Sequence, residues 1–120
     1  LDVHVVPLRL SEPNFITHKR AQGHGLPLGG HDKVPGNMDG AVVLIENADP
    51  GFDWIFAYGI AGLVTKFGGA NSHMAIRCAE FGIPAAIGCG EQIFDRIARS
   101  PSVEINCSEG HIQPIVPDPS

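Results

Sequence analysis

The sequence predicts one α/β domain in which neighbouring strands run mostly parallel. From Gly36 onward, short and continuously apolar runs rich in Val, Ile and Ala alternate with segments of helical pattern. A hairpin pattern then closes the chain. The length of 120 residues and the hydrophobic fraction of 43% are those of a single globular domain with its own core.

The elements of this domain are expected in the order strand, helix, strand, helix, strand, helix and hairpin. Apolar runs predict strands at 41–45, 60–65 and 85–87. Helices are predicted at 49–58, 72–81 and 91–99: Asp49-Pro50 is a typical helix start, and Gly59 and Gly82 are typical helix ends. Residues 102–106 and 111–116 predict the hairpin, and 117–120 a tail.

Residues 1–35 are expected to be irregular. Alternating Val and Leu residues at 3–10 and the segment 15–17 suggest short extended pieces, and the glycine-rich stretch 23–30 predicts turns. We therefore expect a lead-in segment at 1–35, or an edge of the domain, and the domain proper at 36–120. Because the chain begins at Leu1 rather than Met, we expect it to be a piece of a longer protein.

Composition excludes several classes of protein. The chain has 8 basic and 13 acidic residues, for a net charge of −5, and no basic patch that would favour nucleic acid as a partner. The apolar stretch 55–64 is too short to cross a membrane, and no signal-peptide pattern is present. The three cysteines and six histidines match no metal-binding spacing. A cytoplasmic domain with no metal site, no bound cofactor and no membrane partner is expected.

The segment 65–73 carries the chemistry that the sequence predicts. Gly68 and Gly69 allow backbone amides to approach a ligand closely, and the helix that follows directs its free N–H groups at the same space. Asn71 or Ser72 can cap that helix, which places His73 in its first turn. Thr65, at the end of the preceding strand, either hydrogen-bonds to the site or satisfies the loop backbone.

A histidine in this position is suited to carrying a phosphoryl group. The positive end of the helix dipole favours neutral imidazole, which is the nucleophilic form, and stabilises the negative charge that a phosphoryl group brings. Helical spacing places Arg77 and Glu80 on the face of His73, with Met74, Cys78, Phe81 and Ala residues on the buried side. Arg77 is therefore a candidate phosphate contact, and a simple surface ion pair is the alternative. By itself the loop is equally compatible with a structural histidine.

The same segment resembles the swivelling phosphohistidine domain of phosphoenolpyruvate-utilising enzymes, such as phosphoenolpyruvate synthase, pyruvate phosphate dikinase and enzyme I of the sugar phosphotransferase system. The likeness covers about residues 38–116. The matching motif positions are Thr65, Gly68, Gly69, Ser72, His73, Ala75, Gly82, Ile83, Pro84, Ala85 and Gly88.

The resemblance implies a three-layer β/β/α swivelling fold and a phosphotransferase component. By this resemblance, His73 would accept a phosphoryl group from ATP or phosphoenolpyruvate and pass it to pyruvate or another small molecule. ATP and Mg²⁺ would bind to an ATP-grasp partner domain, and a further domain would hold the acceptor. Both partners are expected in the same full-length polypeptide, and the isolated domain is expected to show no turnover.

The sequence departs from the family motif at two places. Asn71 stands where the family often has Thr, and Ala79 stands before Glu80 where the family usually has Arg. The arginine lies instead at Arg77, which turns it by about 200° toward His73. The lead-in at 13–17 and the nearly terminal placement of the domain resemble synthase-like small-molecule kinases with a C-terminal histidine domain, including rifampicin phosphotransferases and capsule-associated glutamine kinases.

A second function remains open at this stage. Swivelling modules such as the small subunit of aconitase-like dehydratases share the layered fold and need no nucleophilic histidine. The combination of Gly68-Gly69 with His73 at a helix start favours the phosphoryl carrier.

Overall fold

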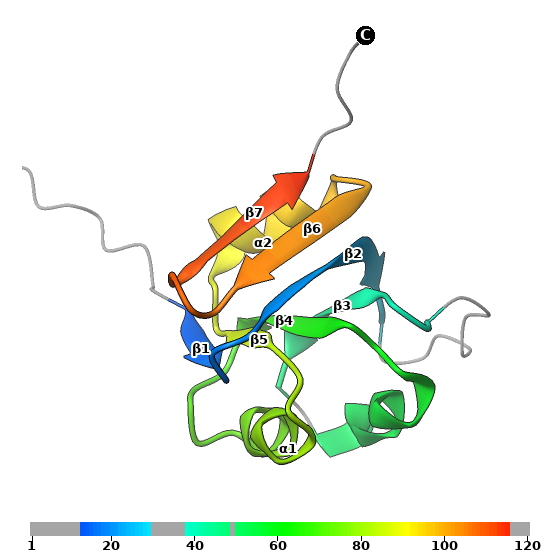
Figure 1. The fold of residues 1–120 in the computed structure, drawn as a ribbon, viewed down its shortest axis with the longest axis vertical. Helices are drawn as coiled ribbons and strands as arrows, with labels where there is room; N and C mark the ends of the chain where they lie inside the picture. The colour runs from blue at the N-terminus through cyan, green and yellow to red at the C-terminus, as the bar shows by residue number, and fades with distance from the viewer. Residues whose placement is uncertain (1–12, 30–37, 49, 116–120) are drawn as a thin grey trace, which may run out of the picture.

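The computed structural model describes residues 13–29, 38–48 and 50–115. They form one seven-stranded mixed sheet in the order β1-β5-β4-β3-β2-β6-β7 (Figure 1). The predicted α/β class is confirmed. The helices η1, α1 and α2 connect the strands in the alternating order that the sequence predicts.

Parallel strands form the centre of the sheet. β3 (Val42–Asn47) lies between β2 (Arg20–Pro27) and β4 (Gly62–Phe67), and β5 (Ala85–Ile87) follows on the far side of β4. The strands predicted at 41–45, 60–65 and 85–87 are thereby confirmed, with β4 beginning two residues later than expected. Connections between parallel strands must cross over the sheet, and η1 makes this crossing between β3 and β4, as α1 does between β4 and β5.

Both faces of the central strands are covered, which explains their continuously apolar sequences. On one face, Val43, Ile45 and Leu63 pack against η1 (Pro50–Tyr58) and α1 (His73–Phe81). On the other face, Val42, Leu44 and Val64 pack with α2 (Glu91–Ala98) and β6 (Ser102–Asn106). Figure 1 shows these layers, with α1 and η1 on one side of the sheet and α2 on the other.

The prediction of turns at 23–30 was wrong for residues 23–27, which belong to β2. This strand pairs in parallel with β3 and antiparallel with β6, so it joins the two halves of the sheet. Its glycines serve close packing instead of turns. A Cβ on Gly23 would lie 2.2 Å from the carbonyl oxygen of Gly40, so a side chain has no room there.

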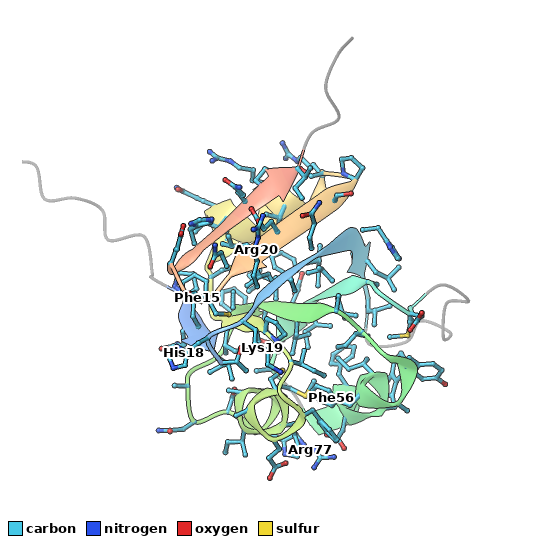
Figure 2. The ribbon with its side chains drawn as sticks, viewed as in Figure 1. Phe15, His18, Lys19, Arg20, Phe56 and Arg77 are labelled. Atoms are coloured by element: carbon cyan, nitrogen blue, oxygen red, sulfur yellow. The ribbon has the colours of Figure 1, made fainter. Side chains whose placement is uncertain are left out.

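The two ends of the sheet are antiparallel additions. β1 (Asn14–Ile16) pairs with β5, close to the extended piece predicted at 15–17. β6 and β7 (His111–Ile115) form the predicted hairpin. After β1, Lys19 crosses to α1 and its Nζ donates to the Gly82 carbonyl at 3.0 Å (Figure 2). The extended pieces expected at 3–10, residue Asp49 and the tail at 117–120 lie outside the described residues.

The helix predicted at 49–58 is a 3₁₀ helix, η1. Gly51 and four aromatic residues give this segment low α-helix propensity, and the fully buried Ile55 packs it against the core. The helices predicted at 72–81 and 91–99 are confirmed as α1 and α2. Within the residues placed by the structure, no helix is long and apolar enough to cross a membrane.

Candidate functional site

Residue His73 is the first residue of α1, and Ser72 is its cap. Ser72 has an extended backbone, and its Oγ accepts a hydrogen bond from the Ala75 N–H at 3.3 Å. The helix ends at Gly82, which adopts a left-handed conformation with φ of 68°. Of the two candidate caps, Ser72 therefore takes the role, which makes His73 the first residue of the helix, in the turn whose N–H groups lack helical carbonyl partners.

The Gly68-Gly69 loop is fixed by backbone contact with the loop after β5. A Cβ on Gly88 would lie only 2.3 Å from the Gly68 carbonyl oxygen, and a Cβ on Gly68 would lie 2.8 Å from that of Ala48. Gly69, in contrast, has open space around it. The loop is thus held firmly from behind and is open in front, where α1 begins.

Thr65 anchors this arrangement from the end of β4. Its side chain is fully buried, donates from Oγ1 to the Phe67 carbonyl at 2.9 Å and accepts from the Gly88 N–H at 2.9 Å. Of the two roles considered for Thr65, these contacts support satisfaction of the loop backbone. The neighbouring Lys66 lies within ion-pair distance of Glu91 and Asp95 of α2, at 3.7 and 4.0 Å.

His73 is tied to Arg77 through a carboxylate. Oδ1 of Asp53, on η1, lies 3.0 Å from Nε2 of His73 and 3.0 Å from Nε of Arg77. Arg77 also donates from Nη1 to Glu80 at 3.1 Å. The side chains of His73 and Asp53 are each 42% exposed, so the imidazole is accessible from solvent and is not packed in the core.

The contacts within this cluster favour the charged forms of both Asp53 and Arg77. The hydrogen bond from His73, reinforced by Arg77, holds the pKa of Asp53 below its ordinary value of 3.8, although partial desolvation opposes this. The hydrogen bond to Asp53 raises the pKa of Arg77, with Glu80 adding to the effect. Asp53 is therefore ionised at neutral pH and only accepts hydrogen bonds, so Nε2 of His73 is the donor.

Aromatic side chains border the cluster. The guanidinium carbon of Arg77 lies 4.8 Å from the ring centre of Phe81, and Phe81 stacks on Phe56 at 5.2 Å. Figure 2 shows Phe56 and Arg77 where η1 and α1 meet. The expectation that Phe81 is buried was wrong: it is 51% exposed, because at the end of α1 it extends over the helix pair and not beneath it.

The structure brings together most of the predicted site residues. Gly68, Gly69, Ser72 and His73 meet at the start of α1, and Asn71 is exposed beside them. Arg77 reaches the histidine only through Asp53, and the surface ion pair considered for it is present with Glu80.

Asp53 was missed from sequence. It is the only charged residue between Pro50 and Thr65, which marks it as unusual, but the pairing of η1 with α1 is a tertiary feature. Among the described residues, no three His, Cys, Asp or Glu side chains are grouped so that they could hold a metal ion.

Comparison with known proteins gives one family match and several curated relatives. Residues 37–110 match the family described as "PEP-utilising enzyme, mobile domain". The chain is 34% identical over 106 residues to phosphoenolpyruvate synthase of Escherichia coli, covering 83% of this chain and 13% of that protein. It is 32% identical over 83 residues to rifampicin phosphotransferase of Streptomyces sviceus, covering 68% of this chain and 9% of that protein. The chain thus spans about a tenth of the length of these relatives.

Solved structures show the same fold. The NMR structure of a UPF0107 protein aligns with a TM-score of 0.65 and 18% identity, over 87% of this chain and 97% of that one. The NMR structure of an Enzyme I protein (nEIt) aligns with a TM-score of 0.54 and 24% identity, over 77% of this chain and 35% of that one. The predicted three-layer swivelling architecture is thereby confirmed.

Proposed function

Because the chain belongs to the family of mobile domains of phosphoenolpyruvate-utilising enzymes, we propose that His73 carries a phosphoryl group between two partner domains. The domain is a component of a phosphotransferase. Its role is to collect a phosphoryl group from ATP, or from phosphoenolpyruvate, and to deliver it to pyruvate or another small molecule.

The observation that carries this proposal is the position of the imidazole. His73 is the first residue of α1, 42% exposed, beside an open glycine loop. A helix N-terminus stabilises anions through its free N–H groups and its dipole, and glycines allow a ligand to approach the backbone. This is the environment that a negatively charged phosphoryl group on the ring requires.

The transfer itself needs only a ring nitrogen with a free lone pair. That lone pair forms a bond to phosphorus while the bond from phosphorus to the donor oxygen breaks, and the leaving group departs with the electron pair. Reversal toward an acceptor oxygen completes the cycle. Arg77 lies on the same face of α1 and supplies a guanidinium to neutralise the transferred group.

Other domains complete the proposed enzyme. We propose an ATP-grasp domain that binds ATP and Mg²⁺, and a separate domain that binds the acceptor, both in the same polypeptide. The much greater length of the relatives supports this arrangement. We place the protein in the cytoplasm, where the three free cysteines of this chain remain reduced.

The test is to load the chain with phosphate from its donor. The chain is mixed with the donor domain of its full-length protein and either ATP or phosphoenolpyruvate. Mass spectrometry should then show an acid-labile adduct of about 80 Da on His73 with one of the two donors, and none on His73→Ala. Absence of the adduct with both donors, or full activity of the full-length His73→Ala protein, would refute the carrier role and favour a non-catalytic swivelling module.

A further inference from the structure

The place beside Nε2 of His73 is already occupied by an anionic oxygen. The same Oδ1 atom of Asp53 lies 3.0 Å from Nε2 of His73 and 3.0 Å from Nε of Arg77. The two donors belong to α1, and the acceptor belongs to η1. One carboxylate oxygen thus sits in a position that an imidazole and a guanidinium share.

A phosphoryl group on Nε2 would need this same position. Carboxylate and phosphate oxygens are alternative partners of guanidinium groups, which bind both through charge-assisted hydrogen bonds. Arg77 lies on the Nε2 side of the ring, so it is a phosphoryl group on Nε2 that Arg77 can neutralise. Asp53 and the phosphoryl group cannot occupy one place together, and their charges repel each other.

Resting on the carrier role of His73, we propose that Asp53 is a displaceable counter-ion. In the unloaded state its carboxylate accepts hydrogen bonds from Nε2 of His73 and from Arg77. On loading, the phosphoryl group replaces the carboxylate at both positions. When the phosphoryl group leaves, Asp53 returns. The carboxylate therefore stabilises the unloaded form and raises the tendency of the loaded form to pass its phosphoryl group on.

The contact with Asp53 determines which nitrogen of His73 carries the proton in the unloaded state. A carboxylate only accepts, so in the unloaded state Nε2 carries a proton and its lone pair is not free. Opening of the contact lets that proton pass to solvent while Nδ1 takes one up, which leaves the neutral ring with a lone pair on Nε2. The nitrogen–phosphorus bond then forms and the donor's phosphorus–oxygen bond breaks, with the Nδ1 proton retained.

The exposure of the cluster allows the exchange. Asp53 and His73 are each 42% exposed, and the Arg77 side chain is 34% exposed, so water can solvate the released carboxylate. Glu80 continues to hold Arg77 from its other side, at 3.1 Å, so the guanidinium stays in place while its partner changes.

The experiment compares Asp53→Asn with the unchanged chain and with Asp95→Asn. Asparagine keeps the shape of Asp53 and removes its charge, and Asp95 offers the same chemical change on α2, across the sheet. Phosphoramidate loads histidines chemically, so the test does not depend on the donor domain. Amide NMR spectra confirm that each variant is folded. Phosphorus and histidine-nitrogen NMR then identify the loaded nitrogen of His73 and follow its loss.

We expect the phosphoryl group of the unchanged chain on Nε2 of His73. We expect Asp53→Asn to lengthen its lifetime by roughly threefold to tenfold, the effect of removing one partly exposed like charge, and Asp95→Asn to leave it unchanged. An unchanged or shortened lifetime in a folded Asp53→Asn, or loading on Nδ1, would overturn the displacement. Neither result bears on whether His73 is loaded by a protein donor, which the adduct experiment decides separately.

Discussion

The Gly88 N–H donates to Oγ1 of Thr65 at 2.9 Å, which joins the loop after β5 to the end of β4 directly behind the Gly68-Gly69 loop. The same N–H also lies 3.1 Å from the Thr65 carbonyl oxygen. Thr65 is fully buried and Gly88 is half-buried at this junction, which brings Gly88 against the backbone of Gly68. The loop that leads to His73 is therefore supported by a contact between Thr65 and Gly88 that contains no charged group.

Thr65→Val should destabilise the domain, because it removes the hydroxyl that accepts from Gly88 and donates to Phe67 while keeping the shape of the side chain. We expect a loss of about 1 kcal/mol in the free energy of unfolding, measured by urea denaturation. Thr65→Ser keeps the hydroxyl and serves as the control for the hydrogen bonds. Equal stability of Thr65→Val and the unchanged chain would show that these bonds contribute nothing.

Gly88→Ala should be far more damaging than Gly69→Ala. A Cβ at Gly88, where φ is 74°, would meet the Gly68 carbonyl oxygen at 2.3 Å, whereas a Cβ at Gly69 meets open space. We expect a loss of about 2 kcal/mol or more for Gly88→Ala and a change within about 0.5 kcal/mol for Gly69→Ala. Thermal unfolding followed by circular dichroism would measure both, and similar stabilities for the two variants would contradict the close approach.

Arg77→Ala should slow the loading of His73 and shorten the lifetime of the phosphohistidine. The guanidinium shares Oδ1 of Asp53 with His73 and so lies beside the proposed position of the phosphoryl group, and we expect each change to be roughly tenfold. Arg96→Ala, which removes an exposed arginine of α2, is the matched control. Loading and lifetime that match those of the control would show that Arg77 only holds the surface of α1 together.

Acidification should weaken the sheet at Glu104. Burial of Glu104 is compensated by hydrogen bonds from Gln113 and Arg20, which hold its pKa below the ordinary value of 4.5. As the pH falls, Glu104 of the unfolded chain therefore takes up its proton before Glu104 of the native chain does. The contribution of ionised Glu104 to the free energy of unfolding is complete above about pH 4.5, and it is lost as the pH falls through the native pKa. Glu104→Gln should flatten the pH dependence of stability below this point, and the exposed Glu46→Gln should not. A steep acid dependence that persists in Glu104→Gln would assign it to other carboxylates.

The cysteines should resist thiol reagents in the native state. Burial raises the pKa of Cys78 to about 12 and that of Cys89 to about 11, and it also raises the pKa of Cys107. At pH 8 almost no thiolate is present on the first two, and access is blocked as well. A chromogenic disulfide reagent should therefore react with them only after urea is added. Rapid reaction of folded protein would contradict their burial.

Local signals in the sequence predicted the elements that hold the site. The strands β3, β4 and β5 are continuously apolar because both of their faces are covered, and α1 has a serine cap and a terminal glycine that any helix would use. His73 and Ser72 were therefore placed correctly without knowledge of the tertiary structure.

Features that depend on distant contacts were not predictable in this way. β2 contains Gly23, Gly25 and Pro27, which are typical of turns. Gly23 lies in the strand because the Gly40 carbonyl oxygen approaches too closely for a side chain, and the sequence gives no sign of that neighbour. Asp53 acquires its importance only when η1 packs beside α1, twenty positions away from His73. Phe81 likewise lies at a position that helical spacing would bury, but it stacks on Phe56 of η1 and is 51% exposed.

The contact between Gly68 and Gly88 is made of main chain alone, so it does not depend on the side chains that surround the imidazole. Substitution of Asn71, Arg77 or the surrounding aromatic residues would therefore change the surface around His73 and leave in place the loop that presents its imidazole.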